Sequence, residues 1–199
     1  MDVTMDVLSD VILLLLNKAG ENGLTKNQII KLVFFVDLEA AKRIGMPLTD
    51  CDYKTYTYGV VDFSVWDKVN ALAKKNIGLK IHSYPTGFGN DSYKAVLDPN
   101  TVDLEGVSQL VNDIVEAVWF EYGSFSASKL GGITKQLVPM DDEWEINIPV
   151  DVRDIAYEQS EEFAEMVRRS KDPNNYGEAM TYEEFMQYLE NEYKSIPTE

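Results

Sequence analysis

His82 and Cys51 are the two residues of this sequence that metal or nucleophilic chemistry would use first. His82 is the sole histidine and alternates with apolar neighbours, so a metal site would need the distant Cys51 and carboxylates in no recognised ligand spacing. A nucleophilic Cys51 would need a base and an orienting group beside the thiol, and nothing in the sequence places them there. The sequence therefore predicts no metal site and no cysteine nucleophile.

Other patterns of catalysis or cofactor binding are equally weak. The run TGFGNDS, residues 86–92, has two glycines at G-x-G spacing, but it lacks the third glycine of a dinucleotide loop and joins two strand-like segments. Adjacent carboxylates such as Asp141 and Asp142 point in different directions on a helix, and acidic runs usually lie on a solvated face. We expect no enzyme and no cofactor, and a hydrolytic enzyme is the weakest hypothesis.

A tyrosine-rich stretch is the stronger functional signal. Tyr53, Tyr56 and Tyr58 lie among Thr and Asp residues, in a segment that suits a structured loop or a short strand. Aromatic side chains on a rigid scaffold are frequent hot spots of protein interfaces, because they bury much area and lose few rotamers. Two interpretations remain open: the tyrosines cover the core and hydrogen-bond at its rim, or they contact a partner.

Charge and composition exclude several classes of partner. The chain has 34 acidic and 18 basic residues and a net charge of −16, which argues against nucleic acids and anionic membranes. One cysteine allows no internal disulfide and suits a reducing compartment, so we expect a cytoplasmic protein. The apolar run Val11–Leu16 is too short to span a membrane and follows Asp2, Asp6 and Asp10 instead of the positive charge of a secretory signal.

The elements that would position the tyrosines begin with two helices. Residues 7–18 are apolar on both faces and stop at GENG, which predicts a first helix. Thr25 and Gln28 have the spacing of a capping box, and the helix that they open runs from Lys26 to about Ile44. Because residues 32–36 leave no polar face, we expect this second helix to lie inside the core.

Three further helices and one hairpin are predicted before residue 139. Asp62 is a candidate cap for a helix in which Phe63, Trp66 and Val69 recur every three residues and which ends before Gly78. Two alternating segments around a Gly and Asn-rich connection predict a β-hairpin over residues 79–97. An amphipathic helix is expected from Asp103 to Tyr122, with Leu110 on its apolar face, and a short helix from about 127 to 137.

The last sixty residues differ in composition from the rest. Residues 140–199 hold 17 acidic and 5 basic residues, a net charge of −12. Helices are expected over about 150–170 and from a capping box at Thr181 and Glu184. We therefore predict a domain over 1–139 and an acidic helical extension over 140–199, docked on the body through apolar residues such as Phe185.

The order of the predicted elements is similar to that of a winged helix. In such folds a recognition helix reads the major groove of DNA. Here the corresponding helix continues as Val33, Phe34, Phe35 and Val36, which offer DNA no polar face. The predicted fold class is mainly α, within α+β: a compact helical domain with winged-helix-like order and one small β-hairpin, plus the acidic helical C-terminal extension.

Residues 31–61 resemble the diagnostic segment of the Panacea (SocA-like antitoxin) domain. That segment has a Lys-Leu start, an aromatic and an Asp in a buried helix, a G-x-P-[IL]-[TS] turn, a Tyr, and a final Tyr-Gly-Pro-Val. Val60 replaces the proline. The matching positions are Lys31, Leu32, Phe35, Asp37, Gly45, Pro47, Leu48, Thr49, Tyr53, Tyr58 and Gly59.

A second segment, residues 126–144, is similar to the family's Ser-Ala-x-x-Leu-x-x-x-Thr-His run that leads to a Trp. Lys135 stands where the family usually has His. The aligned residues are Ser126, Ala127, Leu130, Thr134 and Trp144. The resemblance covers roughly residues 5–145 and leaves the acidic extension outside.

This resemblance implies an antitoxin domain of bacteria, archaea and their mobile genetic elements, which neutralises a toxin encoded beside it by direct protein contact. Related members are proposed to deliver toxins to a protease, so a protease is a second implied partner. The alternative hypothesis is an acidic inhibitor or nucleic-acid mimic, from a mobile element or a virus, that acts on a basic partner. The candidate protein-binding residues are Tyr53, Tyr56, Tyr58, Gly59, Trp66, Thr134 and Trp144.

Overall fold

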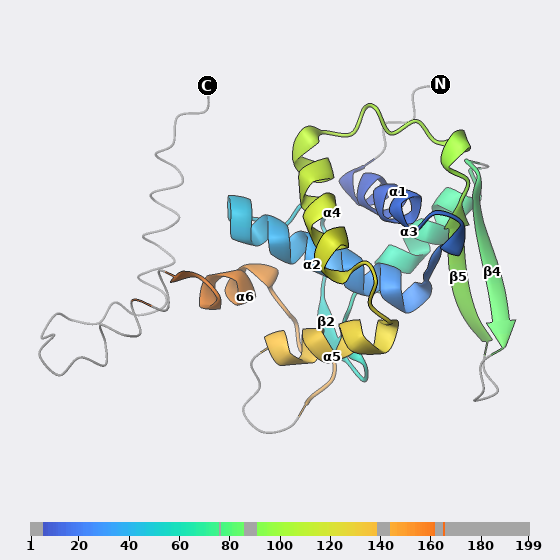
Figure 1. The fold of residues 1–199 in the computed structure, drawn as a ribbon. Helices are drawn as coiled ribbons and strands as arrows, with labels where there is room; N and C mark the ends of the chain where they lie inside the picture. The colour runs from blue at the N-terminus through green and yellow to red at the C-terminus, as the bar shows by residue number, and fades with distance from the viewer. Residues whose placement is uncertain (1–5, 76, 86–90, 139–143, 162–164, 166–199) are drawn as a thin grey trace, which may run out of the picture. The chain divides into compact units, whose positions relative to one another are not determined.

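The computed structural model describes residues 6–75, 77–85, 91–138, 144–161 and 165. The chain divides into two compact units, residues 1–158 and 159–199, and every helix and strand labelled in Figure 1 belongs to the first. The first unit extends past the limit predicted at residue 139. Helices dominate it, so the predicted mainly helical α+β class is confirmed.

One helix, α2 (Lys26–Ile44), lies at the centre of the first unit. Residues 32–36 are all buried, as the absence of a polar face predicts. Five other helices pack against α2 (Figure 1). These are α1 (Val7–Ala19), α3 (Ser64–Ala73), α4 (Gln109–Tyr122), α5 (Ala127–Leu137) and α6 (Val152–Glu158).

The ends of α2 form as the sequence predicts. The Thr25 hydroxyl oxygen accepts a hydrogen bond from the Gln28 N–H at 3.3 Å, and the Gln28 side-chain oxygen accepts one from the Thr25 N–H at 3.0 Å. This confirms the capping box. Gly45 ends the helix in a left-handed conformation with φ 76°, and its N–H donates to the Ala41 carbonyl at 3.0 Å.

A three-stranded antiparallel sheet lies at one end of the unit, with strand order β1-β5-β4 (Figure 1). Its hairpin, β4 (Leu79–Pro85) and β5 (Asp91–Leu97), confirms the one predicted over residues 79–97. The two-residue strand β1 (Leu24–Thr25) joins α1 to α2 through a 3-10 turn at Gly20–Asn22 and pairs with β5. The order α1, β1, α2, α3, β4, β5 is therefore winged-helix-like.

A second, two-stranded sheet is inserted between α2 and α3. It consists of β2 (Lys54–Tyr56) and β3 (Gly59–Val61), so the tyrosine-rich stretch contains the short strands that its composition favours. Residues 147–150 run antiparallel beside β2, with an isolated bridge between Lys54 and Pro149. We call β2, β3 and residues 147–150 together the ribbon.

The predicted start of α3 is wrong by one residue, and that of α4 by six. α3 begins at Ser64, with Phe63 at its N-cap, although the Asp62 carboxylate does accept the Ser64 N–H at 2.8 Å. α4 begins at Gln109 and not at Asp103, because the Ser108 hydroxyl caps it and the residues before it form turns.

The remaining differences concern exposure and the far end of the chain. Leu110, expected on the apolar face of α4, is exposed on α4 instead. A 3-10 turn at Pro99–Thr101 follows the hairpin. The helix predicted over about 150–170 is shorter than expected, because α6 runs only from Val152 to Glu158 and a turn follows at residues 159–160. Residues 162–164 and 166–199, with the whole helix predicted from residue 181, lie outside the described residues. No helix in the described ranges is long and apolar enough to cross a membrane.

Candidate protein-binding site

A buried carboxylate holds the chain that leads from α2 into the ribbon. Asp37, on α2, is fully buried, and one of its oxygens accepts the N–H groups of Leu48 and Thr49, each at 2.9 Å. The other accepts the Thr49 hydroxyl at 2.5 Å and the Tyr53 hydroxyl at 2.6 Å. Burial raises the pKa of Asp37 more than these four hydrogen bonds lower it. The carboxylate therefore fixes the turn after α2 from inside the core.

A buried lysine on the same helix holds strand β3. The Lys31 ammonium, with the residue only 3% exposed, donates to the Val60 carbonyl oxygen. Burial, and secondly the charge of Lys135, lowers the pKa of Lys31 to about 8. The Val60 N–H donates in turn to the Thr134 hydroxyl oxygen at 3.2 Å. The outer edge of β3 is thus closed by side chains from α2 and α5.

Two glycines let α5 approach β3 this closely. Gly59 has φ 95°, and a Cβ there would lie 2.1 Å from the Thr134 hydroxyl oxygen. A Cβ at Gly131 of α5 would lie 2.5 Å from the Tyr58 carbonyl oxygen. Both distances are shorter than any normal contact, so side chains at these positions would push α5 away from the ribbon.

Residues 144–150 pair with the edge of β2 that faces away from β3. The Thr55 N–H donates to the Ile148 carbonyl at 2.9 Å, and the Asn147 N–H donates to the Thr55 carbonyl at 2.8 Å. The Trp144 indole N–H donates to the Tyr56 carbonyl at 2.8 Å. The backbone N–H and carbonyl of the buried Thr55 are therefore satisfied within the chain.

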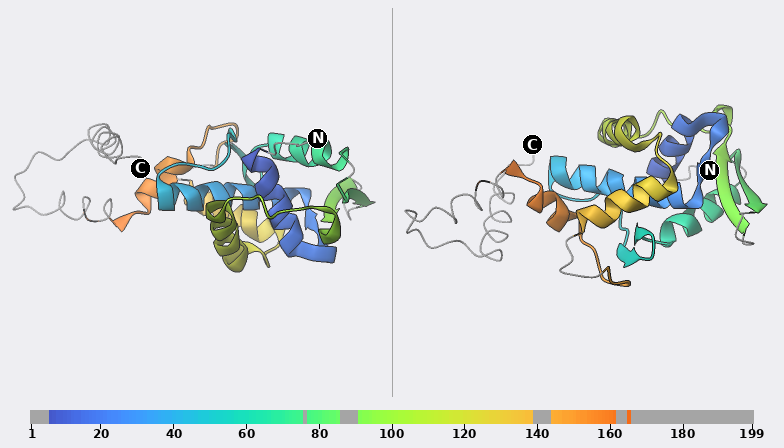
Figure 2. Two further views of the ribbon diagram at one scale, coloured as in Figure 1. Left: turned by 90° about the horizontal axis from the view of Figure 1, so that it is seen from above. Right: turned by 60° about the horizontal axis from the view of Figure 1, so that its bottom comes forward.

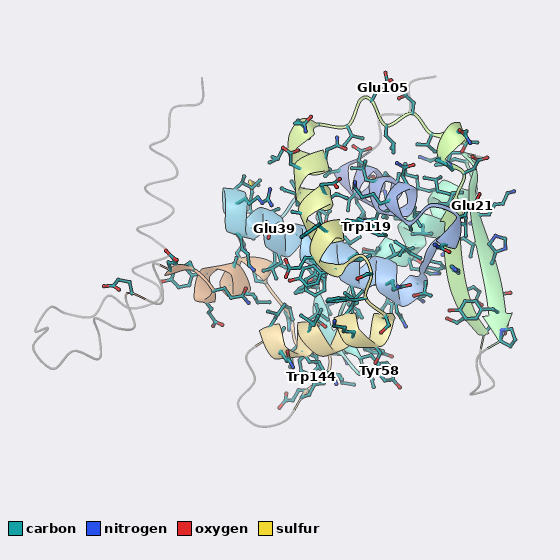
Figure 3. The ribbon with its side chains drawn as sticks, viewed as in Figure 1. Glu21, Glu39, Tyr58, Glu105, Trp119 and Trp144 are labelled. Atoms are coloured by element: carbon teal, nitrogen blue, oxygen red, sulfur yellow. The ribbon has the colours of Figure 1, made fainter. Side chains whose placement is uncertain are left out.

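With both edges closed, the ribbon presents aromatic side chains to solvent. Tyr58 is 75% exposed at the turn between β2 and β3, and Tyr56 lies edge-on to Phe63 with ring centroids 5.4 Å apart. Figure 3 shows Tyr58 and Trp144 on the same side of α5. The Lys135 ammonium lies 5.0 Å from the centre of the Trp144 ring. We call Tyr56, Tyr58, Phe63 and Trp144 the ribbon face.

The structure divides the predicted protein-binding residues into two groups. Tyr56 and Tyr58 are exposed and Trp144 is half-buried, so these three can contact a partner. The others are inside the fold: Tyr53, Gly59, Trp66 and Thr134.

Two contributors to the site were missed or misread in the sequence. Phe63 was expected on the helix face with Trp66 and Val69, but it is 46% exposed because it sits at the N-cap of α3 and turns toward Tyr56. Lys31 matches the family segment, but its buried contact with β3 was not predicted. The sequence did indicate this burial. Lys31 lies directly before an apolar run that leaves the helix no polar face, so its side chain points into the core.

Neither chemistry considered for Cys51 finds support in its surroundings. Burial, the largest cause, raises the pKa of the Cys51 thiol to about 11, so little thiolate is present at neutral pH. In the described part of the chain no three His, Cys, Asp or Glu residues are grouped as a metal ion would need. What the site offers is a fixed aromatic surface.

By its elements, the first unit is a mainly helical α+β domain of winged-helix-like order with an aromatic ribbon inserted after its central helix. Its sequence matches the family model of the SocA-like antitoxins, the Panacea domain, over residues 29–139, which is more than half of the chain. The chain therefore belongs to the SocA-like antitoxin, Panacea domain, family. The match is shorter at both ends than the resemblance seen over residues 5–145. No curated protein and no solved structure gives a match.

Proposed function

We propose that this protein neutralises a protein toxin by direct contact, and that the ribbon face is the contact surface. The observation that carries the proposal is the contrast between the buried polar residues that hold the ribbon and the exposed tyrosines that it presents. Buried Asp37, Lys31 and Thr134 hold the ribbon rigid, while Tyr56 and Tyr58 stay in solvent. A surface fixed in advance loses little conformational entropy on binding, which favours affinity.

Membership of an antitoxin family supports the class of partner, and the surface supports the mode of action. A domain with a fixed aromatic surface can act by covering the toxin without transforming it. Trp and Tyr, together with Arg, are the residues that most often carry the binding energy of protein interfaces. In this proposal the protein acts in the cytoplasm, where its toxin is made.

Rescue of growth tests the proposal. The toxin encoded beside this gene would be co-expressed with the wild-type protein, with Tyr58→Ala, and with Phe120→Ala as a matched control. Phe120 is 92% exposed on α4, so its removal takes away an exposed aromatic ring on another element. We expect Tyr58→Ala to weaken toxin binding by about tenfold or more and to impair rescue, and Phe120→Ala to keep both. Equal rescue by the two variants would refute the assignment of the ribbon face.

One observation favours a second candidate, the acidic inhibitor or nucleic-acid mimic. Residues 140–199 hold a net charge of −12 out of −16, and carboxylates at such density can imitate phosphates on a basic partner. In that case a variant with four Glu→Gln changes in this segment should no longer inhibit its partner, while its melting temperature stays unchanged. The changes are Glu161→Gln, Glu162→Gln, Glu183→Gln and Glu184→Gln. Toxin neutralisation through the ribbon face predicts instead slower association and retained rescue.

A further inference from the structure

The aromatic rings of the ribbon continue into a longer row that crosses three elements. Tyr56 of β2 contacts Phe63, and the Lys26 ammonium at the start of α2 lies 5.4 Å from the Phe63 ring centre and 5.9 Å from that of Trp66. Trp66 of α3 in turn contacts Tyr93 of β5, with centroids 6.2 Å apart. We call Tyr56, Phe63, Trp66, Tyr93 and Lys26 the aromatic strip.

Three of the four rings of the strip reach solvent. Tyr56, Phe63 and Tyr93 are exposed, whereas Trp66 is buried. The right view of Figure 2 shows the ribbon, α3 and the β4–β5 hairpin following one another along one side of the first unit. Exposed aromatic rings along one side of a domain can mark a site of protein interaction.

Lys26 gives the strip a positive charge. Among the described residues no carboxylate lies within ion-pair distance of its ammonium, which faces two aromatic rings instead. The nearest acid in sequence to Phe63 is Asp62, and its two oxygens are occupied by the N–H groups of Asp52 and Ser64. The Lys26 ammonium is therefore a single point on the strip at which a carboxylate of a partner can form an ion pair.

The backbone of the ribbon does not offer a strand to a partner. On its outer side, Asn147 has φ 65° and Pro149 has no N–H to donate, and both features prevent a further strand from pairing. The other side is closed by Lys31 and Thr134. A partner must therefore be recognised through the side chains of the strip and not by strand addition.

We propose that the aromatic strip binds a polypeptide segment in which acidic side chains alternate with apolar ones. The apolar side chains lie on the rings, and a carboxylate pairs with Lys26, whose charge is already partly shielded from water by Phe63 and Trp66. A second carboxylate can reach Lys135 beside Trp144. This inference rests on the proposed function and specifies the chemistry of the toxin segment that the protein covers.

Selection from a random dodecapeptide library, displayed on phage and bound to the immobilised full-length protein, tests this chemistry. We expect the selected peptides to be enriched in Asp or Glu between apolar residues. The consensus peptide should bind Lys26→Gln about fivefold or more weakly than wild type, whereas its Glu→Gln counterpart should bind both proteins alike. Lys42→Gln, the same charge change about 24 Å along α2, is the matched control and should keep full binding.

Three results would overturn the proposal: no consensus, a basic or uncharged consensus, or an acidic consensus that Lys26→Gln binds as well as wild type does. These outcomes differ from failure of the proposed function, which is read from toxin rescue by Tyr58→Ala. If rescue depends on Tyr58 while the selection shows no acidic preference, the ribbon face stands as the contact surface and only the partner chemistry falls.

Discussion

Replacing Lys31 by Met should alter the way in which the protein's stability depends on pH. The pKa of Lys31 is lowered from 10.5 to about 8 by burial. Between these values the unfolded chain keeps the proton that the folded chain has lost, so the stability of the wild type rises with pH in this window. The full window corresponds to about 3.4 kcal/mol, and the part from pH 7 to 9.5 to about 2 kcal/mol. Met has no such proton to lose.

Urea unfolding followed by tryptophan fluorescence, at pH 7.0 and at pH 9.5, measures this effect. The quantity to compare is the unfolding free energy of wild type minus that of Lys31→Met. The Met variant also lacks the donor to the Val60 carbonyl, but that loss is largely the same at both pH values. The difference should move in favour of the wild type by on the order of 2 kcal/mol at the higher pH.

Subtraction is needed because other groups act in the opposite direction. Burial raises the pKa of Cys51 to about 11 and that of Tyr53 well above its ordinary value, so ionisation of the unfolded chain first destabilises the fold at alkaline pH. Both proteins share this loss. Lys42→Met, an exposed change on the same helix, is the control and should show the pH dependence of the wild type. The difference in unfolding free energy between the wild type and Lys31→Met is compared at pH 7.0 and pH 9.5. A change of less than about 0.5 kcal/mol between the two pH values would refute the reasoning that Lys31 is a buried cation.

Three further predictions follow from the packing around α2 and the ribbon. Phe35→Ala should destabilise the fold by about 3–5 kcal/mol in denaturant unfolding, because the buried ring leaves a cavity; a loss below about 1 kcal/mol would contradict its central position. Tyr56→Ala should leave the melting temperature nearly unchanged and weaken toxin binding by about 1–2 kcal/mol in calorimetry, since its ring is exposed; parallel losses in both would assign it to the fold instead. Gly131→Ala should destabilise by about 1–3 kcal/mol through its clash with the Tyr58 carbonyl, whereas Gly132→Ala, with nothing within 4 Å of the new Cβ, should be neutral or stabilising; similar melting temperatures would argue against the close α5–ribbon contact.

Local signals in the sequence were enough to predict several elements. The capping box at Thr25 and Gln28 correctly predicted the start of α2, because caps act within four residues of the helix end. The start of α4 was missed because Asp103 and Ser108 both have the residue type of a cap, and sequence does not show which one the chain uses. The two-residue strand β1 is too short for any period to reveal it.

The candidate site could be predicted only in part, because its geometry depends on contacts between distant residues. The tyrosine-rich composition pointed to the segment that contains the site. It did not show that Tyr53 is buried, with its hydroxyl donating to Asp37, sixteen positions earlier. The link from Trp144 to the Tyr56 carbonyl spans 88 positions. Local spacing carries no information on such pairs, so the division between buried and exposed tyrosines required the structure.

The third strand-like segment of the ribbon has a consequence for how this domain can be exchanged between proteins. The family match ends at residue 139, yet the polar backbone atoms of Thr55 are satisfied by residues 147 and 148. A chain cut at the family limit would expose an open strand edge, which is prone to pair with other chains. Gene fusions that transplant the domain must therefore carry this segment with it or provide a substitute, and truncations meant to keep the fold should end after α6 and not at residue 139.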